Sequence, residues 1–247
     1  MRKFGLIGKS IDHSLSKAYF LRKFLSEGIT DCIYENFQLD GLRDLRNLIQ
    51  SNIDLCGINI TNPFKLEVMP QLDELDPLAE AVGAVNCIKI TRNKSLINLK
   101  GYNTDITAFR ETLKPLLQRE YRNALVFGTG GASRAICHAL KELNIEHTLV
   151  SRAEKAGALS YPVINDKVIA SHKVIINATP VGMHPDEGKC LPIPYDALTT
   201  SHLLYDLIYN PEETLFLKKG LKAGARIKNG LEMLHLQAEM SWKIWND

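Results

Sequence analysis

A glycine-rich turn joins a short apolar run to the start of a helix in the stretch Leu125-Val-Phe-Gly-Thr-Gly-Gly-Ala-Ser-Arg-Ala135. Gly128 permits the tight turn, and Gly130 allows the backbone to approach a bound pyrophosphate. The N–H groups and the dipole of the following helix favour an anion. Ser133 stands where the usual third glycine would be, so the pattern is incomplete. The stretch therefore predicts a dinucleotide-binding turn, with an ordinary strand–helix connection as the alternative.

The end of the next predicted strand bears on which dinucleotide would bind. A NAD site places an Asp or Glu about 20 residues after the glycines, where it accepts hydrogen bonds from the ribose hydroxyls. This chain has Ser151 and Arg152 there, followed by Lys155. Arg152 is suited to a 2′-phosphate, with Lys155 as a second cation, which indicates NADP. The alternative is that Arg152 is an ordinary solvated surface residue.

Short β-branched runs alternate with amphipathic helical patterns on both sides of this turn. In the second half, strands are predicted at 124–127, 147–150, 174–177, 203–205 and 226–228, and helices at 106–118, 133–143 and 212–223. In the first half, strands are predicted at 4–7, 33–37, 55–60, 84–90 and 96–99, and helices at 15–27, 42–51, 65–69 and 78–82. This alternation is typical of an α/β fold with a mostly parallel sheet covered on both faces.

Three features bear on the organisation of the chain. The helix predicted over 106–118 is the best boundary between two α/β units. We expect a trimmed or irregular crossover over 152–172, because Gly157 and Pro162 interrupt its pattern. A final helix is predicted over 231–245 from apolar residues at three- and four-residue spacing. Periodicity does not indicate which unit this helix packs on.

Composition narrows the classes of protein that need to be considered. The 247 residues carry a formal net charge of +2, with 45% hydrophobic and 23% charged residues, which is ordinary for a globular protein. This balance gives no electrostatic footprint for nucleic acid or an anionic membrane, and no apolar run is long enough for a membrane span. The five cysteines form no C-x-x-C pair and indicate neither a disulfide framework nor a metal site. The chain begins without a signal-peptide pattern, so we expect a reduced, cytoplasmic protein.

Three polar motifs flank predicted elements of the first half. Asn59-Ile-Thr-Asn-Pro-Phe-Lys65 follows a strand, at the edge where α/β sheets bind ligands. His13-Ser14-Leu15-Ser16 precedes the first helix, and Gly101-Tyr-Asn-Thr-Asp105 precedes the boundary helix. Each has a plain structural alternative, since Lys65 suits a solvated surface and Ser or Asp residues commonly cap helices.

The joint occurrence of these motifs resembles the shikimate dehydrogenase family from the first strand to the last helix. The family's I-x-H-S-x-S, N-x-T-x-P-x-K, G-A-V-N and G-x-N-T-D stand here at 11–16, 59–65, 83–86 and 101–105. Its G-x-G-G-A, N-A-T-P-x-G-M, Y-D-x-x-Y-x-P and N-G-L-x-M-L-x-x-Q-A stand at 128–132, 177–183, 205–211 and 229–238. This ordered set is far more specific than any single motif.

The resemblance implies hydride transfer between NADPH and 3-dehydroshikimate, giving shikimate for chorismate and aromatic amino acid biosynthesis. Lys65 would be the acid/base and Asp105 its partner. Hydride arriving at a ketone builds negative charge on oxygen, which an ammonium held by a carboxylate can stabilise and neutralise. The resemblance assigns the substrate carboxylate to Ser14, Ser16 and Tyr209, and the ring hydroxyls to Thr61, Asn86, Asp105 and Gln237.

The resemblance also implies a cofactor site and a domain plan. The NADP contacts would be Gly128, Thr129, Gly130, Gly131, Ala132, Ser151, Arg152, Leu207 and Gly230. Two three-layer α/β/α domains with a cleft between them are expected. They are a substrate domain at 1–104 completed by the helix 231–247, and a Rossmann-type NADP-binding domain at 105–230. We expect a monomer or homodimer acting on a small molecule, without nucleic acid, membrane or metal.

Departures from the family pattern leave alternatives open. Ser151 and Ala153 replace the Asn and Thr of the family's N-R-T, which would weaken the preference for NADP over NAD. A relative that oxidises quinate shares the fold, but Ser16 and Thr61 favour shikimate. A non-catalytic nucleotide-binding relative would be expected to lack Lys65 or the aspartate, and this chain has both.

Overall fold

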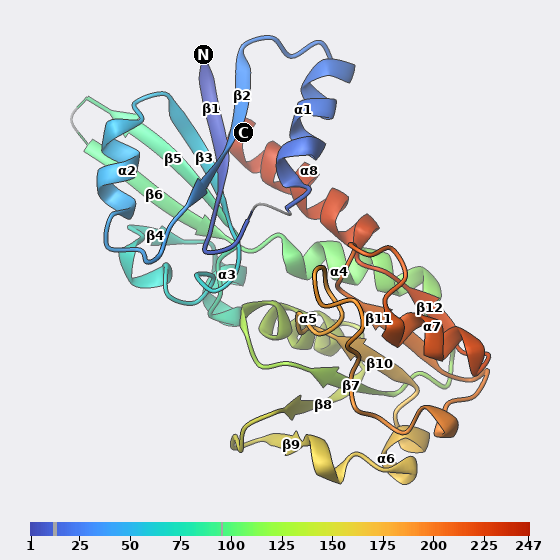
Figure 1. The fold of residues 1–247 in the computed structure, drawn as a ribbon. Helices are drawn as coiled ribbons and strands as arrows, with labels where there is room; N and C mark the ends of the chain where they lie inside the picture. The colour runs from blue at the N-terminus through green and yellow to red at the C-terminus, as the bar shows by residue number, and fades with distance from the viewer. Residues whose placement is uncertain (12–13, 95) are drawn as a thin grey trace. The chain divides into compact units, whose positions relative to one another are not determined.

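The chain folds into two compact units. The computed structural model describes residues 1–11, 14–94 and 96–247. The first unit consists of Met1–Asp105 and His235–Asp247, and the second is Ile106–Leu234. The chain therefore leaves the first unit once and returns to it within its last helix (Figure 1).

A six-stranded sheet forms the centre of the first unit, in the order β2-β1-β3-β5-β6-β4. Its strands are β1 (Arg2–Gly8), β2 (Cys32–Gln38), β3 (Leu55–Ile60), β4 (Glu74–Leu75), β5 (Cys87–Asn93) and β6 (Leu96–Tyr102). β5 is antiparallel to β3 and β6, whereas the other neighbours are parallel. Only two residues separate β5 from β6, too few for the crossover that a parallel pair needs. The sheet is thus parallel apart from β5.

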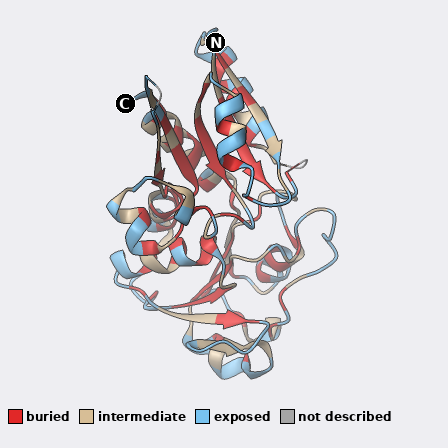
Figure 2. Cartoon of the chain, turned by 90° about the vertical axis from the view of Figure 1, so that its left-hand side faces the viewer, coloured by how far each residue is buried: buried red, intermediate tan, exposed pale blue. Residues whose placement is uncertain are grey.

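Helices cover both faces of this sheet and give the unit three layers. They are α1 (Ser16–Ser26), α2 (Leu45–Ser51), α3 (Pro77–Val82) and α8 (Leu231–Asn246). α2 and α3 share one buried apolar cluster with strand residues such as Ile58. α1 and α8 share the other cluster with Phe4 and Tyr34. Figure 2 shows the strands mostly buried, while the helices expose their outer sides.

The C-terminal helix is fixed to the first sheet by Trp245. The Trp245 indole N–H donates to the carbonyl oxygen of Ile88 at 3.0 Å, and its ring stacks on Phe4 at 4.9 Å between centroids. Gly57 lies under the same indole, which occupies the space that any Cβ at this position would need. A glycine is therefore required in β3 for this close approach.

The second unit contains a fully parallel sheet in the order β12-β11-β10-β7-β8-β9. Its strands are β7 (Asn123–Phe127), β8 (Glu146–Ser151), β9 (Ala158–Ser160), β10 (Val174–Asn177), β11 (Leu203–Asp206) and β12 (Arg226–Lys228). The strand order reverses direction at β7, which is the arrangement of a Rossmann-type dinucleotide-binding fold. The predicted fold class is confirmed.

Helices also cover both faces of the second sheet. They are α4 (Asp105–Leu113), α5 (Gly131–Glu142), α6 (Asp166–Ser171) and α7 (Leu215–Lys222). α6 and α7 share an apolar cluster with strand residues such as Leu125 and Leu204. On the other face, Phe109 of α4 packs edge-on against Tyr205 of β11, at 5.0 Å between ring centroids.

Several predicted elements differ in detail from the observed ones. The helix expected over 65–69 is a run of turns, followed by a short 3₁₀ helix at Met69–Gln71. Pro70 contributes to this difference, because it has no N–H to donate to the carbonyl four residues earlier and so interrupts an α-helix. The expected irregular crossover at 152–172 holds strand β9, a 3₁₀ turn at Tyr161–Val163 and the short α6. Further 3₁₀ turns lie at Lys114–Leu116 and Tyr195–Ala197.

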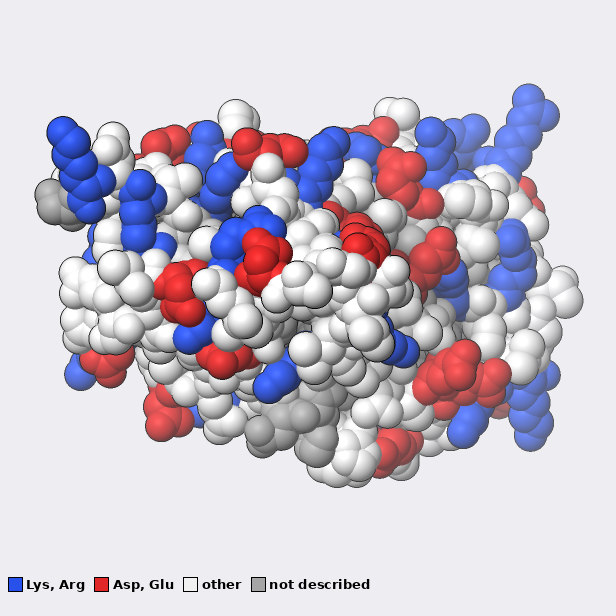
Figure 3. Space-filling model, turned by 90° about the horizontal axis from the view of Figure 1, so that it is seen from above, with Lys and Arg blue, Asp and Glu red and all other residues white. Residues whose placement is uncertain are grey.

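The surface carries charges of both signs. Lys and Arg side chains are interspersed with Asp and Glu over the face seen in Figure 3, without a large patch of one sign. Within residues 1–11, 14–94 and 96–247, no helix combines the length and the apolar character needed to cross a membrane.

Candidate active site

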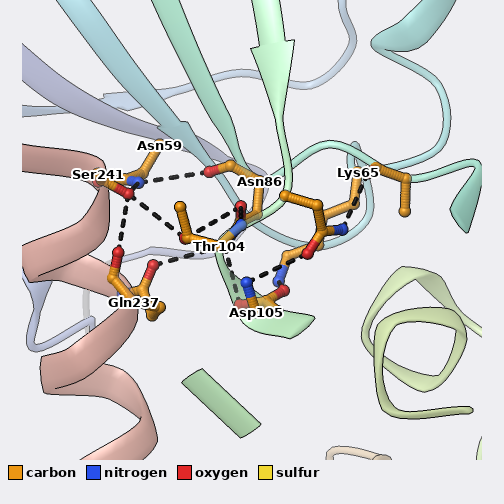
Figure 4. Close-up of polar contacts among 9 residues, drawn as sticks. Asn59, Lys65, Asn86, Thr104, Asp105, Gln237 and Ser241 are labelled. Atoms are coloured by element: carbon orange, nitrogen blue, oxygen red, sulfur yellow. Dashed lines mark hydrogen bonds and ion pairs between the residues drawn. The ribbon is translucent and has the colours of Figure 1, made fainter. Parts of the chain in front are cut away.

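A lysine and an aspartate form a close ion pair in the first unit (Figure 4). The Lys65 ammonium lies 2.6 Å from Oδ2 of Asp105, and the two side chains are 14% and 7% exposed. Lys65 comes from the turns that follow β3, and Asp105 is the first residue of α4. This arrangement keeps an ammonium near the protein surface, held in position by a buried carboxylate.

Backbone and side-chain bonds fix both members of the pair. The carbonyl of Lys65 accepts from the N–H of Val85 at 2.8 Å, which ties the turn to the approach of β5. The N–H of Asp105 donates to Oδ1 of Asn103 at 3.1 Å, and the Asn103 amide donates to the carbonyl of Ala84 at 2.9 Å. Asn103 of the motif G-x-N-T-D therefore fixes the start of α4 against the segment before β5.

Asn86 connects the aspartate to the rest of the unit. Its amide nitrogen donates to Oδ1 of Asp105 at 2.8 Å, so both carboxylate oxygens of Asp105 accept a hydrogen bond. The side-chain Oδ1 of Asn86 accepts from the N–H of Thr104 at 2.7 Å, which fixes the orientation of the amide. Asn86 is only 2% exposed. In this geometry, the side chain of Asn86 orients Asp105.

The C-terminal helix brings Gln237 to the same group. Oε1 of Gln237 lies 3.5 Å from the Asn86 amide nitrogen, although the two residues are 151 positions apart in sequence. One turn later on α8, the Ser241 hydroxyl accepts from the Asn59 amide at 2.8 Å and lies 3.5 Å from the Thr104 hydroxyl. The predicted residues Lys65, Asp105, Asn86 and Gln237 thus lie in one hydrogen-bonded group.

Three members of this group were not predicted individually as site residues. Asn59, Thr104 and Ser241 are 4%, 3% and 0% exposed, and they join β3, the end of β6 and α8. The side-chain Oδ1 of Asn59 also accepts from the hydroxyl of Tyr34 at 2.9 Å. Asn59 and Thr104 lie inside the recognised motifs, which is the signal that could have found them. Ser241 is signalled only by its four-residue spacing from Gln237.

The two predicted carboxylate-binding serines lie side by side. The Ser14 hydroxyl accepts from the N–H of Ser16 at 3.3 Å and lies 3.3 Å from the Ser16 hydroxyl. The N-cap of α1 is Leu15, which offers no side-chain cap bond, so neither serine is the N-cap residue. Residues 12 and 13 of the motif lie outside the described residues.

Thr61 and Tyr209 complete the predicted substrate set. Thr61 follows β3, its N–H donates to the carbonyl of Ile7 at 2.9 Å, and its side chain is partly exposed. Tyr209 belongs to the second unit and lies in the loop that follows β11, where it is half-buried.

The glycine-rich turn fits a dinucleotide phosphate. Gly128 has φ +113°, and a Cβ there would lie 2.9 Å from the carbonyl oxygen of Ala178. A Cβ at Gly130 would meet nothing within 4 Å, so the backbone is open on that side. Thr129 lies between these glycines, and Gly131 and Ala132 begin α5, whose unpaired N–H groups and positive dipole end suit an anion. The residues present therefore fit the group that the sequence predicts.

Ser133 takes the place of the third glycine without blocking the turn. Its side chain is 1% exposed, and its hydroxyl would lie 3.0 Å from a Cβ at Gly128. A small residue suffices for this close packing of helix on strand.

The remaining predicted cofactor residues lie at the ends of neighbouring strands. Ser151 ends β8 and is 9% exposed, and the exposed Arg152 follows it. Arg152 lies near Tyr161, where its positive charge opposes the increase in the pKa of the tyrosine that burial causes. Gly230 packs against the carbonyl of Leu207, which leaves no room for a side chain.

In the described parts of the chain, no three His, Cys, Asp or Glu side chains lie together in a group that could hold a metal ion.

Comparisons with known proteins identify relatives over almost the whole chain. Residues 6–88 match the family model described as the shikimate dehydrogenase substrate binding domain. A protein of Methanococcus maripaludis named shikimate dehydrogenase (NADP(+)) is 37% identical over 262 residues, which cover 98% of this chain and 90% of the relative.

Solved structures are similar over almost the whole chain. The shikimate 5-dehydrogenase of Thermus thermophilus in complex with NADP(H) and shikimate has a TM-score of 0.85 and 28% identity, covering 99% of this chain and 93% of that one. The quinate dehydrogenase of Corynebacterium glutamicum in complex with NAD has a TM-score of 0.85 and 26% identity, with the same coverage. The identity to the Methanococcus protein over nearly both full lengths decides the assignment, and this chain belongs to the shikimate dehydrogenase family.

Proposed function

We propose that the protein catalyses the reversible NADPH-dependent reduction of 3-dehydroshikimate to shikimate in chorismate and aromatic amino acid biosynthesis. The observation that carries this proposal is the 2.6 Å ion pair between Lys65 and Asp105. It supplies a proton donor of fixed orientation, as the reduction of a ketone requires.

Lys65 acts on the carbonyl oxygen of the substrate. NADPH, when bound, supplies the hydride. As negative charge develops on the carbonyl oxygen, the Lys65 ammonium stabilises it and then donates a proton to it. In the oxidation of shikimate, the neutral amine of Lys65 accepts the proton of the hydroxyl group.

Asp105 orients the lysine and is itself held by Asn86. Its Oδ2 accepts from Lys65 and its Oδ1 accepts from Asn86, so neither oxygen can turn away without losing a hydrogen bond. The positioned carboxylate keeps Nζ of Lys65 where the substrate carbonyl would arrive, which reduces the reorganisation that accompanies proton transfer.

The substrate is recognised by two sets of polar side chains. We assign its carboxylate to the hydroxyls of Ser14, Ser16 and Tyr209. The ring hydroxyls are assigned to Thr61, Asn86, Asp105 and Gln237. Residues 1–104 with the helix 231–247 form the substrate domain in this proposal, and residues 105–230 form the NADP-binding domain.

The cofactor would be held by the glycine-rich turn and the adjoining strand ends. Gly128–Ala132 would take the pyrophosphate, and Ser151 with Arg152 would take the adenosine ribose and its 2′-phosphate. Leu207 and Gly230 would line the remaining part of the site. The open backbone at Gly130 and the start of α5 support this assignment.

We infer a cytoplasmic location and a monomeric or homodimeric enzyme. The five cysteines are free thiols, which suits a reducing compartment. The proposed product is a small carbocyclic acid of biosynthesis, and NADPH is a cofactor of reductive biosynthesis.

The direct test follows the absorbance of the reduced nicotinamide after shikimate and NADP⁺ are mixed with the purified protein. We expect the band to grow with the wild type and to be almost absent with Lys65→Ala. Parallel reactions with quinate, and with NAD⁺, measure the substrate and cofactor preference. No growth of the band with shikimate and either cofactor would contradict the proposal, and faster growth with quinate would reassign the substrate.

A further inference from the structure

Two buried polar side chains that the proposed mechanism does not use face each other in the second unit. Asn177 ends β10 and Asp206 ends β11, and the two residues lie opposite each other in the sheet. Neither side chain is exposed (0%). The amide nitrogen of Asn177 donates to Oδ1 of Asp206 at 3.0 Å.

Asp206 accepts three hydrogen bonds from three different segments. Besides Asn177, the N–H of Ile208 donates to its Oδ1 at 3.1 Å, and the Thr214 hydroxyl donates to its Oδ2 at 2.6 Å. Ile208 belongs to the loop after β11, and Thr214 is the N-cap of α7. The carboxylate therefore ties this loop to β10 and to the start of α7.

Asn177 shapes the loop that follows β10 in a similar way. Its side-chain Oδ1 accepts from the N–H and the hydroxyl of Thr179, at 3.0 and 2.6 Å. Its amide nitrogen also donates to the carbonyl of Val181 at 3.1 Å. The two side chains together determine the conformation of both loops.

These loops lie directly beside the glycine-rich turn. The N–H of Ala178 donates to the carbonyl of Phe127 at 2.9 Å, and a Cβ at Gly128 would lie 2.9 Å from the Ala178 oxygen. The N–H of Leu207, the residue after β11, donates to the backbone carbonyl of Asn177 at 3.0 Å, so the ends of β10 and β11 are also linked. In open parallel sheets, dinucleotides bind outside these strand ends, where the strand order reverses.

The carboxylate is a poor choice for stability alone. Burial raises the pKa of Asp206 to about 7, so its ionised form is costly to keep in the folded protein. Well-packed apolar residues often serve stability as well as or better than buried charges do. Because Asp206 accepts hydrogen bonds from three donors, its role is instead to fix the conformation of the segments that carry those donors.

We propose that Asn177, Asp206 and Thr214 form a positioning cluster that holds the loops after β10 and β11 in the conformation required to bind the dinucleotide. The inference rests on the proposed function, because it concerns the cofactor of that reaction. None of the three is a catalytic residue, since each acts through the backbone of the loops.

The test compares variants by their affinity for NADP⁺, measured by calorimetry without substrate at about pH 8.5. Asp206→Asn keeps the size of the side chain but replaces one carboxylate oxygen by an amide nitrogen, which cannot accept the hydrogen bond of the Thr214 hydroxyl. Thr214→Val removes the hydroxyl, and Thr214→Ser restores it. Thr112→Val is the matched control, because Thr112 is 3% exposed and its hydroxyl lies 2.7 Å from that of Tyr205, on the opposite face of β11. Thermal unfolding of every variant gives the accompanying change in stability.

We expect Asp206→Asn and Thr214→Val to weaken NADP⁺ binding about tenfold, which corresponds to about 1.4 kcal/mol. Thr214→Ser should bind nearly as the wild type does, and Thr112→Val should lose stability without losing affinity. Wild-type affinity in Asp206→Asn and Thr214→Val, or an equal loss in Thr112→Val, would overturn the proposal. If Asp206→Asn does not fold, the Thr214 pair decides. A wild type that fails to bind NADP⁺ would contradict the proposed function itself, a result distinct from normal binding in the wild type and the variants.

Discussion

The ammonium nitrogen of Lys65 and Oδ2 of Asp105 lie 2.6 Å apart, although the two residues are 40 positions apart in sequence and belong to different segments, the turns after β3 and the start of α4. β3 delivers the lysine, and the end of β6 delivers the aspartate. The two strands are not neighbours, because β5 lies between them, and Asn86, the residue before β5, belongs to the same group. Three adjacent strands of one sheet thus bring these three side chains together.

Replacing the lysine tests its proposed chemical role. Lys65→Ala should lower kcat by roughly two to four orders of magnitude, the usual contribution of a positioned acid/base group. The Michaelis constant for shikimate should change much less. Lys100→Ala, in the same unit and at an exposed ion pair with Glu74, should leave both constants near the wild-type values. Retention of a tenth or more of the wild-type turnover by Lys65→Ala would remove Lys65 from this role.

The adjacent serines should act on substrate affinity. Replacing Ser14 and Ser16 by Ala removes two hydroxyl donors from the substrate carboxylate, each worth roughly 1.5–3 kcal/mol. The Michaelis constant for shikimate should therefore rise by about tenfold or more, while that for NADP⁺ hardly changes. Steady-state kinetics with each substrate varied in turn measure both constants. Equal increases in the two would indicate that the serines only stabilise the start of α1.

Arg152 should select between the two cofactors. It is exposed at the end of β8, where an acidic residue would favour NAD. One charge-assisted contact with a phosphate is worth roughly 1.5–3 kcal/mol, and the absent Asn and Thr beside it place the preference near the lower end. Arg152→Ala should raise the Michaelis constant for NADP⁺ and barely change that for NAD⁺. A wild-type enzyme that uses the two cofactors equally would show that Arg152 does not bind the 2′-phosphate.

Stability should depend on pH through Asp206. Its pKa is about 7 in the folded protein, against 3.8 for a carboxyl group exposed to water, so the folded state binds the proton more tightly. The stability that this group contributes is fully present below pH 4 and is lost as the pH rises to about 7. Relative to Asp206→Asn, the melting temperature of the wild type should therefore fall between pH 4 and 7. A difference between the two proteins that is independent of pH would contradict the raised pKa.

A methyl group at Gly57 should separate α8 from the sheet. Gly57→Ala places a Cβ in the space of the Trp245 indole, and overpacking of this kind costs roughly 1–3 kcal/mol. The unfolding midpoint should fall, and Gln237 should lose its place beside Asn86, which raises the Michaelis constant for shikimate. As a control, Gly41→Ala meets nothing within 4 Å and should leave the midpoint nearly unchanged. An unchanged midpoint in Gly57→Ala would show that Trp245 is free to move aside.

Much of the fold follows from local patterns in the sequence. The glycine-rich turn, the strand before it and the helix after it are predicted by residue type and spacing, and the structure places them as expected. The same holds for β3, whose largely apolar sequence matches a strand buried on both faces. Short edge strands leave no such signal, because the two residues of β4 and the three of β9 cannot show alternation.

Contacts between distant segments were not predictable from local patterns. Asn59 and Ser241 are 182 positions apart, and their bond depends on the face of the sheet that α8 covers. The apolar spacing in α8 predicts a helix but not the surface that receives it. The fit of Trp245 over Gly57 helps to determine that surface, and neither residue shows this in the sequence. The family resemblance supplied Gln237, whereas periodicity could not.

The return of α8 to the first unit has a consequence for synthesis on the ribosome. Residues 1–105 emerge first and contain every strand of the first sheet, but Trp245 reaches this sheet only after the whole second unit has been synthesised. For as long as translation of the second unit takes, Phe4, Phe20 and Tyr34 lack the Trp245 ring that packs against them in the folded protein. We therefore expect the first unit to complete its packing only after α8 has left the exit tunnel.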